Sequence, residues 1–140
     1  MENEINKTYY NNGKLMKKQY LLDGKLHRED GPAEIKYYKS GNIWYKKYYI
    51  NNELHKDDGP ACIYYHENGL IMRKQYFIEK HNLTVRYEKY KNRLTKEMIK
   101  CESGIYNLKL MKLICIESNN TELLESIDCK IVMVQLSEHK

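Results

Sequence analysis

The sequence predicts a mainly β fold, in which an antiparallel meander of 28-residue β-hairpin repeats precedes a small β-rich C-terminal cap with one short helix. Three observations predict it. A stretch of 28 residues recurs without a gap in the first half of the chain. Within each copy, apolar and polar residues alternate with the period of two that is typical of half-buried strands. The chain also holds 14 tyrosines against one Phe and one Trp, and Tyr favours strands because it joins an apolar ring to a polar tip.

The repeat emerges when Asp23–Ile50 is aligned with Asn51–Ile78. The sequence Asp-Gly-Pro-Ala occurs at 30–33 and again at 58–61, and the pair Leu-His occurs at 26–27 and at 54–55. A partial copy covers residues 1–22 and a degenerate copy covers residues 79–90. We therefore predict a repeat array over residues 1–90, followed by an appended segment over residues 91–140.

Each copy predicts two strands and two turns. Pro32–Tyr38 alternates, so that Glu34, Lys36 and Tyr38 share one face and the residues between them share the other. The turn Ser40-Gly41-Asn42 follows, and Ile43–Ile50 is the second strand. Asn51-Asn52 makes the next turn, as Asp23-Gly24 does one copy earlier. Stacked hairpins of this kind bury a shared face that one hairpin alone could not bury.

The C-terminal part has a different composition, since residues 91–140 contain one Tyr. Leu83–Tyr87, Leu108–Ile116 and Lys130–Leu136 have strand composition, and Asn119 followed by Glu122 predicts a short helix through Ile127. Residues 93–101 fit either a helix or a strand. We expect the segment over residues 91–140 to cap the sheet, because a bare sheet edge invites pairing with other chains.

The phrase Asp23–Arg28, followed by Asp-Gly-Pro-Ala and a Tyr-rich strand, resembles the MORN-like repeats of YwqK-type antitoxins. The resemblance covers about residues 5–78. It implies an elongated, twisted β-sheet used for protein–protein contact, similar to modules of antitoxins and of viral or phage proteins. MORN units have Gly after the His, whereas this chain has Arg28 and Lys56 there. Phospholipid binding, which some MORN arrays show, therefore carries over only weakly.

The most tempting catalytic pair is His27 with Asp30. Because the same motif recurs at His55 and Asp58, it serves each copy of the fold, whereas an active site is needed once. We expect both aspartates to accept backbone N–H groups in a turn, with the following Gly in the left-handed conformation. The chain has no triad order, phosphate-binding loop or zinc-ligand spacing. The four cysteines are expected to be reduced thiols. We therefore predict no catalytic residue, no metal and no cofactor.

The tyrosines that recur in register are expected to pack in the core. The opposite face of the second strand instead differs from copy to copy, and positions that read a partner should differ. Aromatic and Arg side chains there are the types that anchor interfaces. The alternative is an ordinary solvated face. The candidate partner-binding residues are Lys17, Tyr45, Lys47, Tyr49, Arg73, Gln75 and Phe77.

Interleaved Lys and Tyr on a sheet also suit RNA or DNA. Residues 79–100 contain seven basic and three acidic residues, whereas residues 1–78 contain 13 and 10. This local excess predicts a second candidate site, for nucleic acid, used together with the same sheet face. A charged run is more often a solvated surface. The candidate residues are Arg86, Lys89, Lys91, Arg93 and Lys96.

Together these patterns predict a non-enzymatic module that binds and neutralises a protein partner, such as a toxin or a host defence protein. RNA or DNA binding is the alternative. The chain opens without a basic-then-apolar leader, so we expect a cytoplasmic location. The most apolar stretch, Leu108–Ile116, is too short to cross a bilayer.

Overall fold

The computed structural model describes residues 3–139 and divides into two units. One unit comprises residues 3–56 and 60–82, and the other comprises residues 57–59 and the chain from residue 83 onward. The strands lie in the first unit and the helices in the second. The prediction of an antiparallel β fold that includes helix is confirmed at this level.

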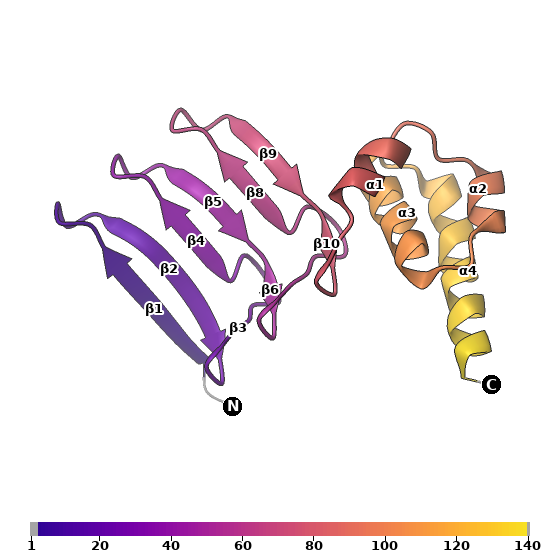
Figure 1. Cartoon of the computed structure of the whole chain (residues 1–140), viewed down its shortest axis with the longest axis horizontal. Helices are drawn as coiled ribbons and strands as arrows, with labels where there is room; N and C mark the ends of the chain where they lie inside the picture. The colour runs from indigo at the N-terminus through magenta and orange to yellow at the C-terminus, as the bar shows by residue number, and fades with distance from the viewer. Residues whose placement is uncertain (1–2, 140) are drawn as a thin grey trace. The chain divides into compact units, whose positions relative to one another are not determined.

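Within residues 3–139 the largest sheet has seven strands, and its neighbouring strands are antiparallel. The order across the sheet is β1-β2-β4-β5-β8-β9, with β3 also paired to β2 (Figure 1). These strands are β1 (Asn3–Tyr9), β2 (Leu15–Leu22), β3 (Lys25–Leu26), β4 (Glu34–Tyr37), β5 (Ile43–Lys47), β8 (Cys62–Tyr65) and β9 (Ile71–Gln75).

The second strand is shorter than expected in the copies over residues 23–50 and 51–78. Instead of one strand over Ile43–Ile50, β5 ends at Lys47 and a new strand begins at Tyr49. The intervening Tyr48 donates its N–H to the Ala61 carbonyl at 2.8 Å and accepts the His55 N–H at 3.1 Å. The chain therefore leaves the main sheet at Tyr48 and enters a small hairpin. The strands of the two small hairpins are β6 (Tyr49–Ile50) with β7 (Glu53–Leu54), and β10 (Phe77–Ile78) with β11 (His81–Asn82).

Main-chain hydrogen bonds at positions 28 apart match each other. The Tyr20 N–H donates to the Ala33 carbonyl at 2.7 Å, as Tyr48 does to Ala61. The Arg28 N–H donates to the Tyr49 carbonyl at 3.1 Å. Lys56 and Phe77, each 28 positions later, form the same bond at 3.1 Å. Each hairpin is thus tied to the next by the backbone, whatever the side chains are.

The two histidines of the Leu-His motif also link neighbouring hairpins. The Nδ1 atom of His27 accepts the Asn51 N–H at 3.2 Å, and the Nδ1 atom of His55 accepts the Glu79 N–H at 2.9 Å. Each acceptor therefore anchors the first residue of the following two-residue turn. This contact gives the recurring histidines a structural role.

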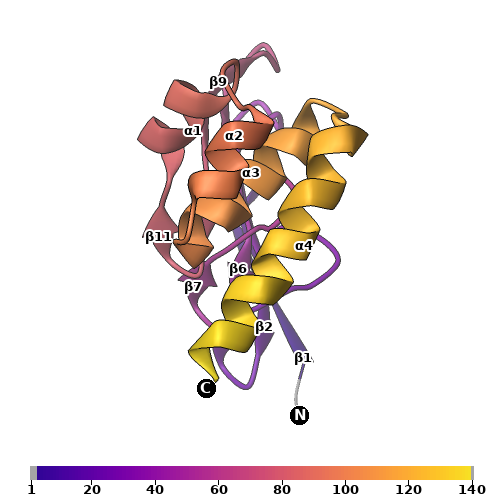
Figure 2. The ribbon, with the colours of Figure 1, turned by 90° about the vertical axis from the view of Figure 1, so that its right-hand side faces the viewer.

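The other unit contains four helices within residues 83–139. They are α1 (Thr84–Tyr90), α2 (Lys96–Cys101), α3 (Ile105–Glu117) and α4 (Thr121–Glu138). Figures 1 and 2 show α3 and α4 side by side. Their packed side chains, with one from α2, form a core of Ile99, Leu108, Met111, Cys115, Leu123 and Ile127.

The prediction that residues 91–140 are β-rich is wrong, because the described part of this segment is helical. Leu108–Ile116 lies in α3, Lys130–Leu136 lies in α4, and Leu83–Tyr87 is occupied by the start of α1. The predicted short helix is the first half of α4, which continues to Glu138. The cause is the apolar content of α3, which buries residues all around its axis and so imitates a buried strand in sequence.

Local capping explains where two of the helices begin. The Thr95 hydroxyl accepts the Met98 N–H at 3.3 Å, and the Asn120 side chain accepts the Leu123 N–H at 3.2 Å. Residues 93–101, which fitted two predictions, therefore include a helix. No helix within residues 3–139 has both the length and the hydropathy needed to cross a membrane.

The turn at Glu79-Lys80 should be improvable. Both residues have positive φ, 47° and 65°, like Asn51 and Asn52 with 48° and 67°. A residue with a Cβ loses about 1 kcal/mol or more of stability in this left-handed region. Gly adopts the region without that cost, and Asn adopts it at a smaller cost than most residues. We expect Lys80→Gly to raise the free energy of unfolding by about 1 kcal/mol, measured by urea denaturation.

The matched control is Lys80→Ala. It removes the same exposed 3.6 Å ion pair with Glu53 but keeps a Cβ, and exposed pairs contribute little. Lys80→Ala should therefore not raise the free energy of unfolding. Equal stability changes for Gly and Ala would contradict the backbone explanation.

Candidate interaction surface

The pairing register decides which side chains share a face of the sheet, because residues directly opposite in an antiparallel pair point to the same side. Two rows of opposed residues cross the strands on one side. One row is Gln19, Glu34, Lys47, Cys62 and Gln75, and the other is Lys17, Lys36, Tyr45, Tyr64 and Arg73. We call this side the variable face, since its residues change from copy to copy.

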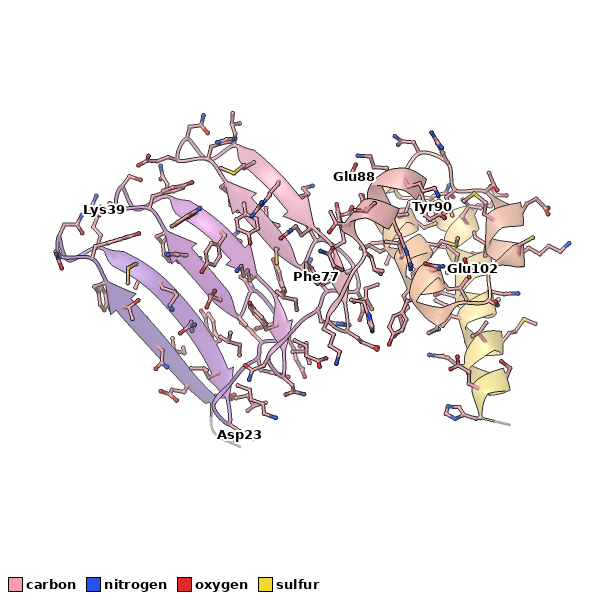
Figure 3. All side chains as sticks on the ribbon, in the orientation of Figure 1. Asp23, Lys39, Phe77, Glu88, Tyr90 and Glu102 are labelled. Carbon is pink, nitrogen blue, oxygen red and sulfur yellow. The ribbon has the colours of Figure 1, made fainter. Side chains whose placement is uncertain are left out.

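Most of the candidate partner-binding residues meet on the variable face, namely Lys17, Tyr45, Lys47, Arg73 and Gln75. Tyr49 and Phe77 do not lie in the main sheet. They belong to β6 and β10, and Figure 3 labels Phe77 in the segment beyond β9. Tyr49 nevertheless lies close enough to Glu34 to be influenced by the charge of that carboxylate.

Aromatic rings form a continuous series over β4, β5 and β8. Tyr38 stacks on Trp44 with the ring centroids 5.4 Å apart and the planes 20° apart. Trp44 lies 6.1 Å from Tyr45, and Tyr45 lies 5.8 Å from Tyr64, both tilted. We call these four rings the aromatic ladder. Such offset and tilted contacts are the favourable ring geometries.

Cations lie over the aromatic ladder. The Lys36 ammonium is 4.6 Å from the Trp44 ring centroid, and the Lys47 ammonium is 4.6 Å from that of Tyr45. The Arg73 guanidinium is 4.1 Å from the Tyr64 ring. Cation–π contacts hold these long side chains in place, which lowers the entropy that a partner must remove on binding.

One buried carboxylate fixes the ladder to the sheet. Glu34 is 8% exposed. Its Oε1 accepts the Tyr45 hydroxyl at 2.9 Å, and its Oε2 accepts the Gln19 side-chain amide at 2.6 Å. Two neutral donors thus satisfy a carboxylate that would otherwise be costly to bury. The network holds the Tyr45 ring in one orientation.

Burial changes the acidity of three groups around Glu34. Burial, together with the hydrogen bond to Glu34, raises the pKa of Tyr45 well above its usual 10. Burial and the nearby Glu34 charge raise the pKa of Tyr49 to about 12. Burial likewise raises the pKa of the Cys62 thiol to about 11, so this cysteine is protonated at neutral pH.

Several members of the ladder were absent from the predicted set. Strict alternation along Ile43–Ile50 would put Trp44 on the face opposite Tyr45, but the register shifts between Lys36 and Tyr37 and leaves Trp44 as an extra residue beside Tyr45. A bulge of this kind re-aims a side chain and is invisible to an alternation pattern. Alternation had placed Tyr38 on the face of Glu34 and Lys36, and this was the signal that could have added Tyr38 to the predicted set.

The Asp-Gly-Pro-Ala segment differs from expectation in its contacts. Asp30 pairs with the Arg28 side chain at 2.9 Å, and that pairing lowers the pKa of the Asp30 carboxyl. The Arg28 guanidinium lies 3.9 Å from the Tyr20 ring centroid. Gly31 is not left-handed; a Cβ there would meet the Arg28 side chain at 2.9 Å. Gly31 therefore makes room for Arg28, and the prediction of a left-handed glycine is wrong.

The second copy repeats part of this arrangement, since the Lys56 ammonium lies 4.8 Å from the Tyr48 ring. The cation after each histidine thus covers the tyrosine whose carbonyl accepts that histidine's N–H. This contact gives a physical reason for Arg28 and Lys56 at the place where MORN units have Gly.

The five basic residues of the nucleic-acid candidate lie around α1 and the start of α2, and four of them contact their own chain. Arg86 donates to the Asn107 side chain at 2.9 Å. Lys91 pairs with Glu88, and Lys96 pairs with Glu122, each at 2.5 Å. Lys89 lies 5.4 Å from the Tyr90 ring, and Arg93 is exposed. The run is therefore partly neutralised.

Among residues 3–139, no three His, Cys, Asp or Glu side chains lie close enough to hold a metal ion. Comparisons of the chain with protein-family models, with curated proteins and with solved structures found no match.

The alkaline stability of the sheet should depend on Tyr49. The folded pKa of about 12 exceeds the ordinary 10, so the neutral hydroxyl is favoured by the fold. The stability that it contributes is fully present below pH 10 and is lost as the pH rises through about 12. Phe cannot ionise, so Tyr49→Phe should lose less unfolding free energy than the wild type between pH 10 and 12.

Urea denaturation at pH 8, 10, 11 and 12 would measure this difference. The two proteins should show parallel behaviour from pH 8 to 10 and diverge above it. Parallel curves over the whole range would contradict the burial of the Tyr49 hydroxyl beside Glu34.

Proposed function

We propose that the sheet is a MORN-like array of 28-residue hairpin repeats, and that it binds and neutralises a protein partner through the variable face. The protein would act as an antitoxin-like module or as a phage-type inhibitor of a host defence protein, in the cytoplasm and without catalysis. The matched hydrogen bonds of Tyr20 with Ala33 and of Tyr48 with Ala61 support the repeat.

The observation that carries the proposal is the aromatic ladder with its cations. Trp, Tyr and Arg are the residues that dominate binding energy at protein interfaces. Here they are held in place before any partner arrives, by ring contacts and by the Glu34 network. A preorganised surface loses little side-chain entropy on association.

The sequence of the variable face favours a folded protein as its partner. The three equivalent positions Lys17, Tyr45 and Arg73 differ in size and chemistry, although each lies at the same place in its copy. A folded protein presents a different surface to each position, so the residues that contact it need not repeat. This mismatch with the underlying period supports recognition of one specific partner.

The test is capture of the partner from a lysate of the native host, followed by identification by mass spectrometry and measurement of affinity. The double variant Trp44→Ser with Arg73→Ser removes one ring of the aromatic ladder and one of the cations that lie over it. It leaves the hydrogen bonds of Glu34 intact. Interface anchors contribute about 2 kcal/mol or more each, so the loss of two should lower affinity by about three orders of magnitude.

The matched control is Lys46→Ser with Lys74→Ser, which changes two residues of the same strands on the opposite face. It should bind the partner with wild-type affinity. A ladder variant that stays within about threefold of the wild type, while folding normally by circular dichroism, would overturn the assignment of the variable face.

A further inference from the structure

The side of the sheet opposite the variable face carries a row of lysines. Reading the register from β1 to β9, the directly opposed residues are Lys7, Lys18, Ile35, Lys46, Ile63 and Lys74. We call this side the lysine face. Lys7 and Lys74 are exposed, and Lys18 and Lys46 are half-buried by neighbouring rings.

The lysine face follows the 28-residue period. Lys18, Lys46 and Lys74 are separated by 28 positions each. Because two strand spacings separate each of these lysines from the next, their backbones lie about 10 Å apart. The tyrosines at 9, 37 and 65 recur at the same offset, and they are exposed or half-buried, so the prediction that they pack in the core is wrong. Lys46 lies 5.8 Å from the Tyr65 ring centroid. The sequence of this face therefore repeats a lysine and a tyrosine, and Lys46 with Tyr65 shows the two side by side.

Carboxylates are scarce beside this row. The strands of the main sheet contain two, Glu4 and Glu34, and the register places both on the variable face. The other carboxylates of residues 3–75 lie in the segments that connect these strands, where Asp30 is paired with Arg28, Glu53 with Lys80, and Glu29 lies 3.7 Å from His27. The remaining ones are Asp23, Asp57, Asp58 and Glu67. Lys7 also stands directly opposite Lys18, and like charges in that position destabilise a sheet. A bound polyanion would remove this repulsion.

We propose that the lysine face binds single-stranded nucleic acid, independently of the protein partner on the variable face. A surface that repeats the same cation and ring at each step fits a polymer whose charges and planar groups also repeat. Lysines neutralise phosphates, and exposed tyrosine rings stack on bases. A single strand offers its bases to such rings, whereas a duplex keeps them paired and stacked. The site is distinct from the basic run of residues 86–96.

The test measures fluorescence anisotropy of a labelled 15-nucleotide single-stranded RNA of mixed sequence between 50 and 200 mM salt. The variant Lys18→Gln, Lys46→Gln, Lys74→Gln removes three charges from the lysine face. The control Lys36→Gln, Lys47→Gln, Arg73→Gln removes three charges from the variable face. The slope of log affinity against log salt changes by about 0.7 for each phosphate of a single strand that the protein ceases to neutralise.

The lysine-face variant should therefore lower that slope by about 2 and weaken binding at 50 mM salt at least about 100-fold. The control should keep nearly the wild-type slope. A second variant, Lys7→Gln with Lys74→Gln, alters only exposed side chains and should lower the slope by about 1.4. Added RNA should also raise the melting temperature of the wild type, because it screens the repulsion between Lys7 and Lys18.

Three results would overturn the proposal. They are equal reductions of the slope in the lysine-face variant and its control, equal affinity for a duplex of the same length, and displacement of the RNA by an equal concentration of a 15-residue poly-glutamate peptide. The last result would assign the row to an acidic protein segment. Retained capture of the protein partner by the lysine-face variant separates this outcome from failure of the function proposed for the variable face.

Discussion

The main-chain hydrogen bonds of Tyr20 and Tyr48 control the arrangement of the whole sheet. Each tyrosine donates its N–H to the alanine of the next Asp-Gly-Pro-Ala segment and accepts an N–H from the following histidine. At Tyr48 the bonds end strand β5 and start a small hairpin, whereas β2 continues through Tyr20 to Leu22. In both copies the bonds fix where the next strand begins. Since strand register has a period of two, this single junction decides which side chains reach each face. Burial of side chains contributes less than these main-chain bonds to the arrangement of the sheet, because most strand residues between positions 3 and 82 are half-buried or exposed.

Because of that junction, the sheet has one face whose residues recur from copy to copy and one face whose residues vary. Positions facing one side, such as Lys18, Lys46 and Lys74, keep the same residue in each copy, whereas Lys17, Tyr45 and Arg73 on the other side differ. The backbone bonds tolerate either pattern, because they do not depend on side-chain identity. The variable face could therefore acquire a ladder of rings and cations around buried Glu34 without disturbing the stacking of hairpins. The repeating face retains a regular row of charge.

The sequence predicts the first unit well because its signals are local. Alternation in Pro32–Tyr38 and the turn residues at Gly41 and at Asn51-Asn52 each report on a few neighbouring residues. Three features escape such reasoning. The bulge at Trp44 depends on the partner strand, the Arg28–Asp30 pair depends on side-chain reach, and α3 is buried on so many sides that its apolar residues lose helical periodicity. The candidate surface was predicted in outline, and its organisation around Glu34 required the register.

Amide hydrogen exchange measured by NMR tests the central role of these junctions most directly. The Tyr20 and Tyr48 amides should exchange slowly and with closely similar protection, since each donates to an alanine carbonyl within the sheet. The Arg28 and Lys56 amides should form a second matched pair, because both donate to the hairpin that follows them. Rapid exchange at Tyr48, or protection that differs about 100-fold between the members of either pair, would contradict a sheet held together by recurring main-chain bonds.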